Sequence, residues 1–253
     1  MARHNAALLL LAVAATAHGE WSIRTTDSEP GRADGVHRHV ILENATARED
    51  AIVDLAIFPA NSCILRIIDN QLGKALSDIM TREKCFAGVN GGYFSSDFAP
   101  VGLLISDGKM IASLQRARLL TGVLVASSRK VQIMRVGEFS RQPKMNAAIQ
   151  CGPFLVDHYE HIRGLNDSVL ARRTFAATGT NQRVMLGLCS EVSLADLATI
   201  LATAPLAKNF KIQRALNLDG GSSSAFWFAR ENGSAFSIPE QKSVRDFVAV
   251  VPR

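Results

Sequence analysis

The stretch Ala215-Leu216-Asn217-Leu218-Asp219-Gly220-Gly221-Ser222-Ser223-Ser224 carries an apolar run directly into a carboxylate, two glycines and three hydroxyls. This pattern predicts a buried strand that ends at a polar pocket. Glycine adopts backbone conformations closed to other residues and lets a ligand approach the main chain, while serines offer hydroxyl and amide groups to oxyanions. The string alone leaves an ordinary turn open, in which Asp219 bonds its own backbone.

A second string, Phe86-Ala87-Gly88-Val89-Asn90-Gly91-Gly92-Tyr93-Phe94, repeats the arrangement with an amide side chain, paired glycines and two aromatic residues. Two such junctions favour a ligand site over two unrelated turns. The aromatic rings of Tyr93 and Phe94 suit stacking on a sugar, and they equally suit core packing with one edge in water.

Around these two strings the chain resembles the phosphodiester glycosidases, a family that removes N-acetylglucosamine from a phosphodiester. Two positions depart from the family pattern: Ser222 stands where a third glycine is usual, and Lys242-Ser243-Val244 aligns with Arg-Pro-Val. Lysine keeps the positive charge but lacks the bidentate fork of arginine. The matching motifs occur in the family's order from about Asp69 onward: 90–94, 102–105 with 107–109, 152–156, 173–174, 193–198 and 217–221.

The resemblance implies a catalytic set of Asp219, Arg173 and Asn90. We expect Asp219 to act at the anomeric carbon, as nucleophile or as base for water, because the leaving phosphate monoester departs without strong acid help. Arg173 would hold the phosphate oxygens through its planar fork, and Asn90 would orient sugar hydroxyls or the attacking water. The implied substrate-binding residues are Gly91, Gly92, Tyr93, Gly220, Gly221, Ser222, Ser223 and Lys242.

The resemblance therefore predicts an exported glycosidase that hydrolyses the sugar C1–O bond of an N-acetylglucosamine-1-phosphodiester-like substrate. Two alternatives stay open: a non-catalytic carbohydrate-binding or exopolysaccharide and envelope-assembly protein, and a phosphodiesterase that cleaves P–O. The serine run does not indicate a Ser–His–Asp hydrolase, because the strand–Gly-x-Ser-x-Gly–helix elbow is absent.

Apolar spacing along the chain predicts an α+β fold, a single domain with a mixed, largely antiparallel β-sheet and a few packed helices. Helices are expected at residues 70–81 and 193–202, the second capped by Ser193 with Asp196 three residues on. Residues 36–253 would form the catalytic domain, and residues 18–35, which lack periodicity, a flexible leader.

The N-terminus predicts export to the periplasm or the medium. An apolar run at residues 6–15 follows Arg3, and Ala15-Thr16-Ala17 fits a cleavage site, so residues 1–17 are expected to be a signal peptide. No later run predicts membrane attachment after cleavage. In an oxidising compartment the four cysteines predict disulfides, with Cys151–Cys189 favoured and Cys63–Cys85 as its complement.

Charge and side-chain chemistry indicate which classes of ligand and cofactor the protein would bind. The net charge of +5 is scattered, without the basic block of a nucleic-acid binder, and it suits a glycan or sugar-phosphate substrate. The sequence requires no cofactor, and nothing in it supports a structural calcium. The pairs His37/His39 and His158/His161 lack the accompanying carboxylate cluster that would indicate a transition-metal site. Asp246 has three interpretations: a second carboxylate of the site, a calcium ligand or a turn residue. The turn residue is favoured. Oligomeric state is left open.

Overall fold

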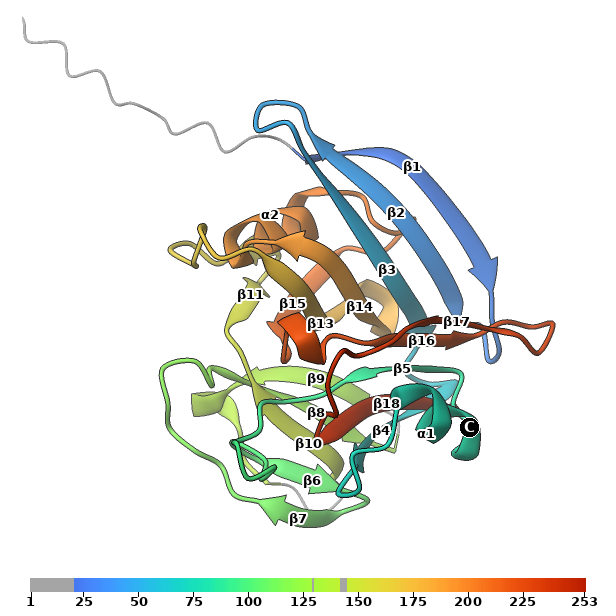
Figure 1. The fold of residues 1–253 in the computed structure, drawn as a ribbon, viewed down its shortest axis with the longest axis vertical. Coiled ribbons are helices and arrows are strands. Elements are labelled where there is room, and N and C mark those ends of the chain that lie inside the picture. Colours follow the sequence, from blue (N-terminus) through green and yellow to red (C-terminus); the bar gives the residue numbers. More distant parts are fainter. Residues whose placement is uncertain (1–20, 129, 142–144) are drawn as a thin grey trace, which may run out of the picture.

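The computed structural model describes residues 21–128, 130–141 and 145–253 (Figure 1). The predicted signal peptide at residues 1–17 lies outside them. Strands account for 51% of the described residues and helices for 11%, so the α+β prediction is wrong and the fold is closer to all-β. The cause is that many short apolar segments, each bounded by a tight turn, outnumber the two amphipathic helix patterns.

Three antiparallel sheets build the described part of the chain, so the predicted single mixed sheet is also wrong. The first sheet has eight strands in the order β1-β2-β3-β14-β13-β15-β11-β12. In that order the strands are β1 (Trp21–Pro30), β2 (Val36–Asn44), β3 (Glu49–Pro59), β14 (Arg183–Val192), β13 (Ala171–Gly179), β15 (Ile212–Asn217), β11 (Phe154–Asp157) and β12 (Glu160–His161).

The second and third sheets have five strands each. The second runs β7 (Lys109–Ala112), β6 (Leu104–Ser106), β10 (Met145–Cys151), β8 (Gly122–Ser127) and β9 (Lys130–Arg135). The third runs β17 (Ala235–Ile238), β16 (Phe226–Ala229), β5 (Ala87–Asn90), β18 (Asp246–Pro252) and β4 (Cys63–Asp69). The helices are α1 (Leu76–Arg82) and α2 (Leu194–Thr203), and the 3-10 turns are η1 (Val136–Glu138), η2 (Thr180–Gln182) and η3 (Gly221–Ser223).

The segment expected to be a flexible leader is ordered from Trp21 onward. It forms β1, which pairs along its whole length with β2. Trp21 is buried against the first sheet, and its indole Nε1 donates to Asp196 Oδ1 of α2 at 3.4 Å. Most other side chains of β1 are exposed, as in an edge strand, so the segment lacks the apolar alternation that would have predicted it.

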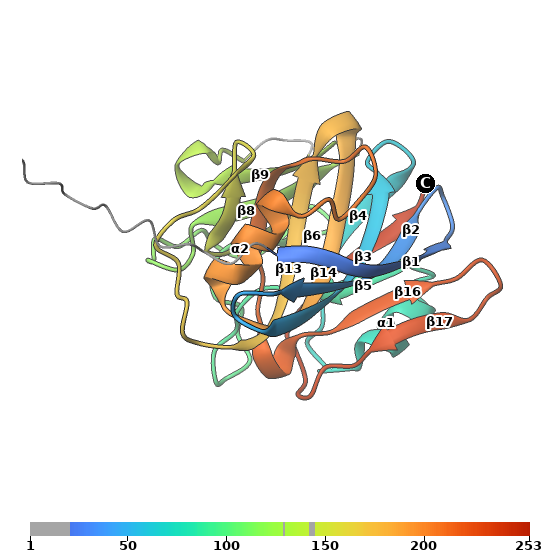
Figure 2. The same ribbon diagram turned by 90° about the horizontal axis from the view of Figure 1, so that it is seen from above.

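The helix at residues 193–202 is confirmed within one residue at each end, as α2. Ser193 caps it, because its Oγ accepts from the main-chain N–H of Asp196 at 3.0 Å. Leu197, Ala198 and Leu201 pack onto the first sheet, which α2 covers on one face (Figure 2). The other predicted helix is shorter than expected, because α1 begins only at Leu76.

The four cysteines are free and buried, so the structure contains neither of the predicted disulfides. Burial raises the pKa of the thiols of Cys63 to about 11 and of Cys85 and Cys189 to about 12, and it raises that of Cys151 as well. Each thiol therefore behaves as a small apolar side chain within its strand or loop.

The first and third sheets meet where the ends of β5 and β15 converge. β5 ends at Asn90, which pairs with Phe247 of β18, and β15 ends at Asn217, which pairs with Phe175 of β13. The main-chain N–H of Asp219, just beyond β15, then donates to the carbonyl of Gly91, just beyond β5, at 2.9 Å. This junction brings the two glycine motifs of the sequence together.

Candidate active site

Asp219 is held by its main chain from two directions. Besides the bond from its N–H to Gly91, its carbonyl accepts from Asn90 Nδ2 at 2.7 Å. The residue lies between β15 and η3, where the chain leaves the buried apolar run and reaches the surface half-buried. The structure shows the predicted buried strand ending just before Asp219 and places this strand end next to the Asn90 turn.

The carboxyl of Asp219 accepts from the main-chain N–H of Gly220 at 2.9 Å through Oδ1. Burial raises its pKa, while the nearby Ser223 hydroxyl, the Gly220 amide and the positive charge of Lys242 lower it, and burial prevails. A carboxylate with a raised pKa is a better nucleophile and a better base than an exposed aspartate. The residue is thus suited to either role at a sugar carbon.

Asp246 is a second carboxyl in the same place, which the sequence favoured as a turn residue. It opens β18, is 1% exposed, and its Oδ1 accepts from the main-chain N–H of Gly92 at 2.8 Å. Burial raises its pKa to about 7, and the charge of Asp219 adds to the rise, while the Gly92 amide and Arg245 oppose it. In the sequence, the only sign of this second carboxyl is an aspartate just ahead of an apolar strand. The pairing of β18 with β5 is what places it beside the glycine turn that follows Asn90.

Asn90 uses its whole side chain inside the protein. Its Oδ1 accepts from Thr174 Oγ1 at 2.7 Å and from the main-chain N–H of Ala225 at 3.0 Å, and its Nδ2 donates to Asp219. The side chain is fully buried. It fixes the position of Asp219 relative to β5, β13 and the serine turn, and does not extend toward a ligand.

The glycines of the two motifs differ in what their amides do. Those of Gly91 and Gly92 donate to the carbonyl and the carboxylate of Asp246, and that of Gly220 donates to Asp219. The N–H of Gly221 has no partner among the residues that the structure describes, and its φ of +62° lies in the left-handed region. A Cβ on Gly91 would collide with Asp246 Oδ1, so close packing requires glycine there.

Tyr93 points its phenol inward. The hydroxyl donates to the carbonyl of Gly152 at 2.6 Å and accepts from Asn217 Nδ2 at 3.2 Å. Burial raises the pKa of this phenol, so it stays protonated. The half-buried ring therefore has a fixed orientation beside the junction.

Arg173 lies next to Gly220, with its Cδ 4.0 Å from the position that a Cβ on that glycine would occupy. Its Nε donates to the carbonyl of Val192 at 3.0 Å and its Nη2 to that of Val169 at 2.5 Å. Burial lowers its pKa, which stays far above neutrality. The guanidinium is thus anchored on one side, and its Nη1 has no partner among the described residues.

Arg172, which sequence reasoning did not choose, ties two surface loops together. Its Nη2 donates to the carbonyl of Ser224 at 2.5 Å, and its Nε lies 3.4 Å from that of Gly221. Its Nη1 also reaches the carbonyl of Pro239 at 3.5 Å. Arg172 therefore holds the serine turn and the Pro239 loop together through their carbonyl groups, a role that no motif in the sequence indicates.

Lys242 is exposed, and its Nζ lies 5.0 Å from the centre of the Phe94 ring. The loop that carries it is joined to the serine turn by a bond from the Gln241 N–H to the carbonyl of Ser222 at 2.8 Å. Its charge acts on the Asp219 carboxyl. The lysine that replaces the family's arginine is therefore placed beside the junction.

Two buried polar atoms near Asp219, Asn217 Oδ1 and Ser224 Oγ, have no hydrogen-bond partner among the described residues, and the buried Ser223 hydroxyl lies near the Asp219 carboxyl and lowers its pKa. Buried polar groups are normally hydrogen-bonded, and exceptions mark sites that water or a ligand completes. Together with Asp219, Arg173 and Lys242 they form a site with hydroxyl and carbonyl groups for sugar hydroxyls and two cations for an anion.

The histidine pairs lie elsewhere. His37 Nε2 and His39 Nδ1 both lie 2.9 Å from Asp54 Oδ1, so the first pair shares a face as its strand spacing allowed. Within residues 21–128, 130–141 and 145–253, no group of three or more His, Cys, Asp or Glu side chains is arranged to hold a metal ion. No helix in the same ranges is long and apolar enough to cross a bilayer.

Comparison with known sequences finds a family match over the region that contains both glycine motifs. The family model for phosphodiester glycosidases matches residues 83–251. A relative from Escherichia coli strain K12, the uncharacterized protein YigE, is 29% identical over 90 residues, which are 33% of this chain and 35% of that protein. The match thus spans about a third of the length of that relative.

Solved structures share the fold at low identity. The zebrafish N-acetylglucosamine-1-phosphodiester alpha-N-acetylglucosaminidase catalytic domain, auto-inhibited by its pro-peptide, aligns with a TM-score of 0.64 at 15% identity, over 90% of this chain and 88% of that one. A hypothetical protein from Synechocystis gives 0.58 at 14%, over 87% and 62%. A Burkholderia pseudomallei K96243 protein classed provisionally as exported gives 0.59 at 14%, over 81% and 74%.

Proposed function

The chain belongs to the phosphodiester glycosidase family, and from this premise we propose that it is an exported hydrolase that cleaves the sugar C1–O bond of a sugar 1-phosphodiester. The proposed sugar is N-acetylglucosamine or a close analogue. The observation that carries the proposal is the placement of the Asp219 carboxyl, which two motifs far apart in sequence hold at the surface with unpartnered polar atoms around it.

The Asp219 carboxylate acts at the anomeric carbon. As a nucleophile it forms a bond to C1 while the C1–O bond breaks and its electron pair leaves with the phosphate; water then releases the sugar. As a base it takes a proton from the water that attacks C1 directly. The anomeric configuration of the product distinguishes these routes, since the first retains it and the second inverts it.

The leaving group explains why one carboxylate suffices. A phosphate monoester has a second pKa near 6, so it departs as a stable anion without a strong acid. Arg173, anchored by the carbonyls of Val169 and Val192, offers its remaining Nη1 to the phosphate oxygens, and Lys242 adds a second positive charge. Asn90 positions Asp219 rather than touching the sugar.

Hydrolysis of a sugar 1-phosphodiester in water enriched in oxygen-18 tests the proposal. We expect the label in the sugar, because the attacking water adds to C1. Label in the phosphate would instead identify a phosphodiesterase that cleaves P–O. Binding of the substrate without any product would identify a carbohydrate-binding protein.

Export is part of the proposal. The charged, then apolar, then small-residue pattern of residues 1–17 supports it, and so does the likeness to a Burkholderia protein classed provisionally as exported. N-terminal sequencing of the protein from its own cell should begin near His18. A mature chain that still carries residues 1–17 would contradict export by this route.

A further inference from the structure

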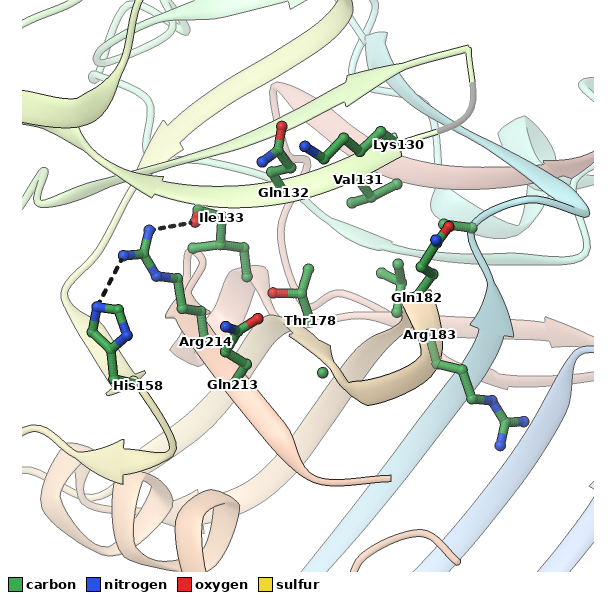
Figure 3. A pocket seen from close by; sticks show the side chains of 13 residues that line it. Lys130, Val131, Gln132, Ile133, His158, Thr178, Gln182, Arg183, Gln213 and Arg214 are labelled. Atoms are coloured by element: carbon green, nitrogen blue, oxygen red, sulfur yellow. Dashed lines mark hydrogen bonds between the residues drawn. The ribbon is translucent and has the colours of Figure 1, made fainter. Parts of the chain in front are cut away.

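A cleft of about 590 Å³ opens between β9 of the second sheet and the ends of β13, β14 and β15 of the first (Figure 3). It lies at the opposite ends of the strands that carry Arg173 and lead to Asp219. Gln213, which lines it, precedes Asp219 by six positions, or roughly 20 Å along extended chain. The cleft is therefore separate from the candidate active site.

One wall of the cleft is polar and the other is apolar. Thr178 and Gln213 extend into it from β13 and β15, and Gln182 borders it from the turn between β13 and β14 (Figure 3). Gln182 and Gln213 are exposed and Thr178 is half-buried, and none of the three side chains has a hydrogen-bond partner among the described residues. Opposite them, the half-buried Val131 of β9 faces the cleft, and Ile133, which is 3% exposed, lines it from the edge of the core. The volume is within the range of small-molecule sites.

Arg214 fixes the two walls relative to each other. Its guanidinium donates to Glu138 Oε2 at 2.6 Å, to the carbonyl of Ile133 at 3.0 Å, and lies 2.9 Å from Asp157 Oδ1 through Nε. Two carboxylates thus neutralise the arginine and join β9, β11 and β15. The cleft is preformed, and this cation is not available to an anionic ligand.

The other cations at the cleft do not face its centre. Arg183 extends away from it, and Lys130 lies along the outer side of β9 (Figure 3). Among the residues that the structure describes, no acidic side chain lines it. The groups that face the interior are therefore uncharged donors and acceptors and methyl groups, with the His158 ring at one end.

Backbone strain borders the cleft on two sides. His158 and Tyr159, at the turn between β11 and β12, have φ of 50° and 72°, and Asn181 and Gln182, at the turn between β13 and β14, have 59° and 53°. Such turns favour Asn and Gly, and left-handed conformations cost other residues about 1 kcal/mol or more each.

We propose that this cleft binds a neutral sugar unit of a glycan. A pyranose has hydroxyls at its edge, which both donate and accept as the amides of Gln182 and Gln213 and the hydroxyl of Thr178 do. It also has an apolar face of C–H groups, which fits Val131 and Ile133. The inference rests on the lining of the cleft and not on the reaction at Asp219.

Calorimetric titration of the Asp219→Asn protein with neutral trisaccharides tests the inference, and α- and β-linked trimers of glucose and of N-acetylglucosamine are the probes. We expect saturable binding of at least one probe. Thr178→Val combined with Gln213→Leu should weaken that binding at least tenfold, the sum of two to three lost neutral hydrogen bonds. Thr25→Val, on the exposed face of β1, is the matched control and should bind like its parent.

Absence of saturable binding by every probe would overturn the inference, and so would a double variant that binds as tightly as its parent. In the wild-type background, the double variant should still hydrolyse a small sugar 1-phosphodiester within twofold of the normal rate. Loss of sugar binding in the cleft and loss of hydrolysis at Asp219 are therefore measured separately. Thermal unfolding of the double variant within a few degrees of its parent confirms that the cleft itself is what changed.

Discussion

Asp219 and Asp246 are linked through one residue, Gly91, whose N–H donates to the carbonyl of Asp246 and whose carbonyl accepts from the N–H of Asp219, each at 2.9 Å. One carboxyl is half-buried at the surface and the other is 1% exposed beneath it. The main chain of the surface aspartate is thus positioned through Gly91 by the main chain of the buried one.

Asp246→Asn should raise the free energy of unfolding relative to the wild type, and it should do so by more at pH 8 than at pH 5. The folded pKa of Asp246 is about 7, above the unfolded value near 3.9, so its contribution to stability is complete below pH 4 and is lost as the pH rises through 7. The full loss is about 4 kcal/mol. Asparagine keeps an acceptor for the Gly92 N–H without a charge.

Urea unfolding at pH 5 and pH 8 measures the effect of Asp246→Asn. Asp27→Asn, at an exposed carboxylate on β1, is the control and should behave alike at both pH values. A difference between Asp246→Asn and wild type that is equal at pH 5 and pH 8 would exclude a buried proton on Asp246.

Asn90→Ala should lower the free energy of unfolding by about 2–5 kcal/mol, because Thr174 Oγ1, the Ala225 N–H and the Asp219 carbonyl all lose a buried partner. Thr174→Val removes only one of these bonds and should cost about 1–2 kcal/mol. Denaturant unfolding gives both values. An Asn90→Ala protein as stable as the wild type would refute the positioning role of the amide.

Arg173→Ala should slow hydrolysis of a sugar 1-phosphodiester by roughly 2–4 kcal/mol of transition-state stabilisation, the scale of one charged donor. Hydrolysis of an alkyl glycoside of the same sugar should change little, since it has no phosphate. Arg173→Lys should restore only part of the loss because lysine lacks the fork. Comparison of kcat/KM on the two substrates makes the measurement, and an equal loss on both would remove Arg173 from phosphate binding.

Asp219→Asn should reduce kcat/KM on both substrates, and by more than Arg173→Ala does, because the carboxylate serves the sugar carbon whichever group leaves. The amide keeps an acceptor for the Gly220 N–H, so the fold should persist. Circular dichroism verifies the fold, and direct titration should show that much of the substrate affinity remains. A normal phosphodiester rate in this variant would rule Asp219 out as the catalytic carboxylate.

The native protein should react with none of its four thiols on the timescale of a minute-long assay with a thiol-specific disulfide reagent. All four are buried with raised pKa values, and the thiolate is the reactive form. All four should react once the chain is unfolded in guanidinium. A reduced chain that shows fast native labelling would contradict this burial.

Local features of the fold were predictable from the sequence, and pairings between distant segments were not. Ser193 and Asp196 lie three residues apart, so their cap could be read directly. The division into three sheets could not be predicted, because strand partners are chosen by contacts between segments far apart.

The candidate site shows the same division. The two glycine motifs predicted Asn90 and Asp219 as site residues, and in the structure these two residues are hydrogen-bonded to each other. The inward orientation of the Asn90 amide depends on Thr174 and Ala225, which belong to other elements and carry no signal. Asp246 was seen only as a residue before a strand, because its burial follows from the pairing of β18 with β5.

The position of β5 in the third sheet bears on how the chain is made. Its partners, β16 and β18, are synthesised long after it. When β5 leaves the ribosome, both of its hydrogen-bonding edges are therefore unpaired. Unpaired apolar edges invite association with other chains, and pairing over such sequence distances is slow. In a nascent chain, β5 therefore stays without its strand partners until β16 and β18 have been synthesised.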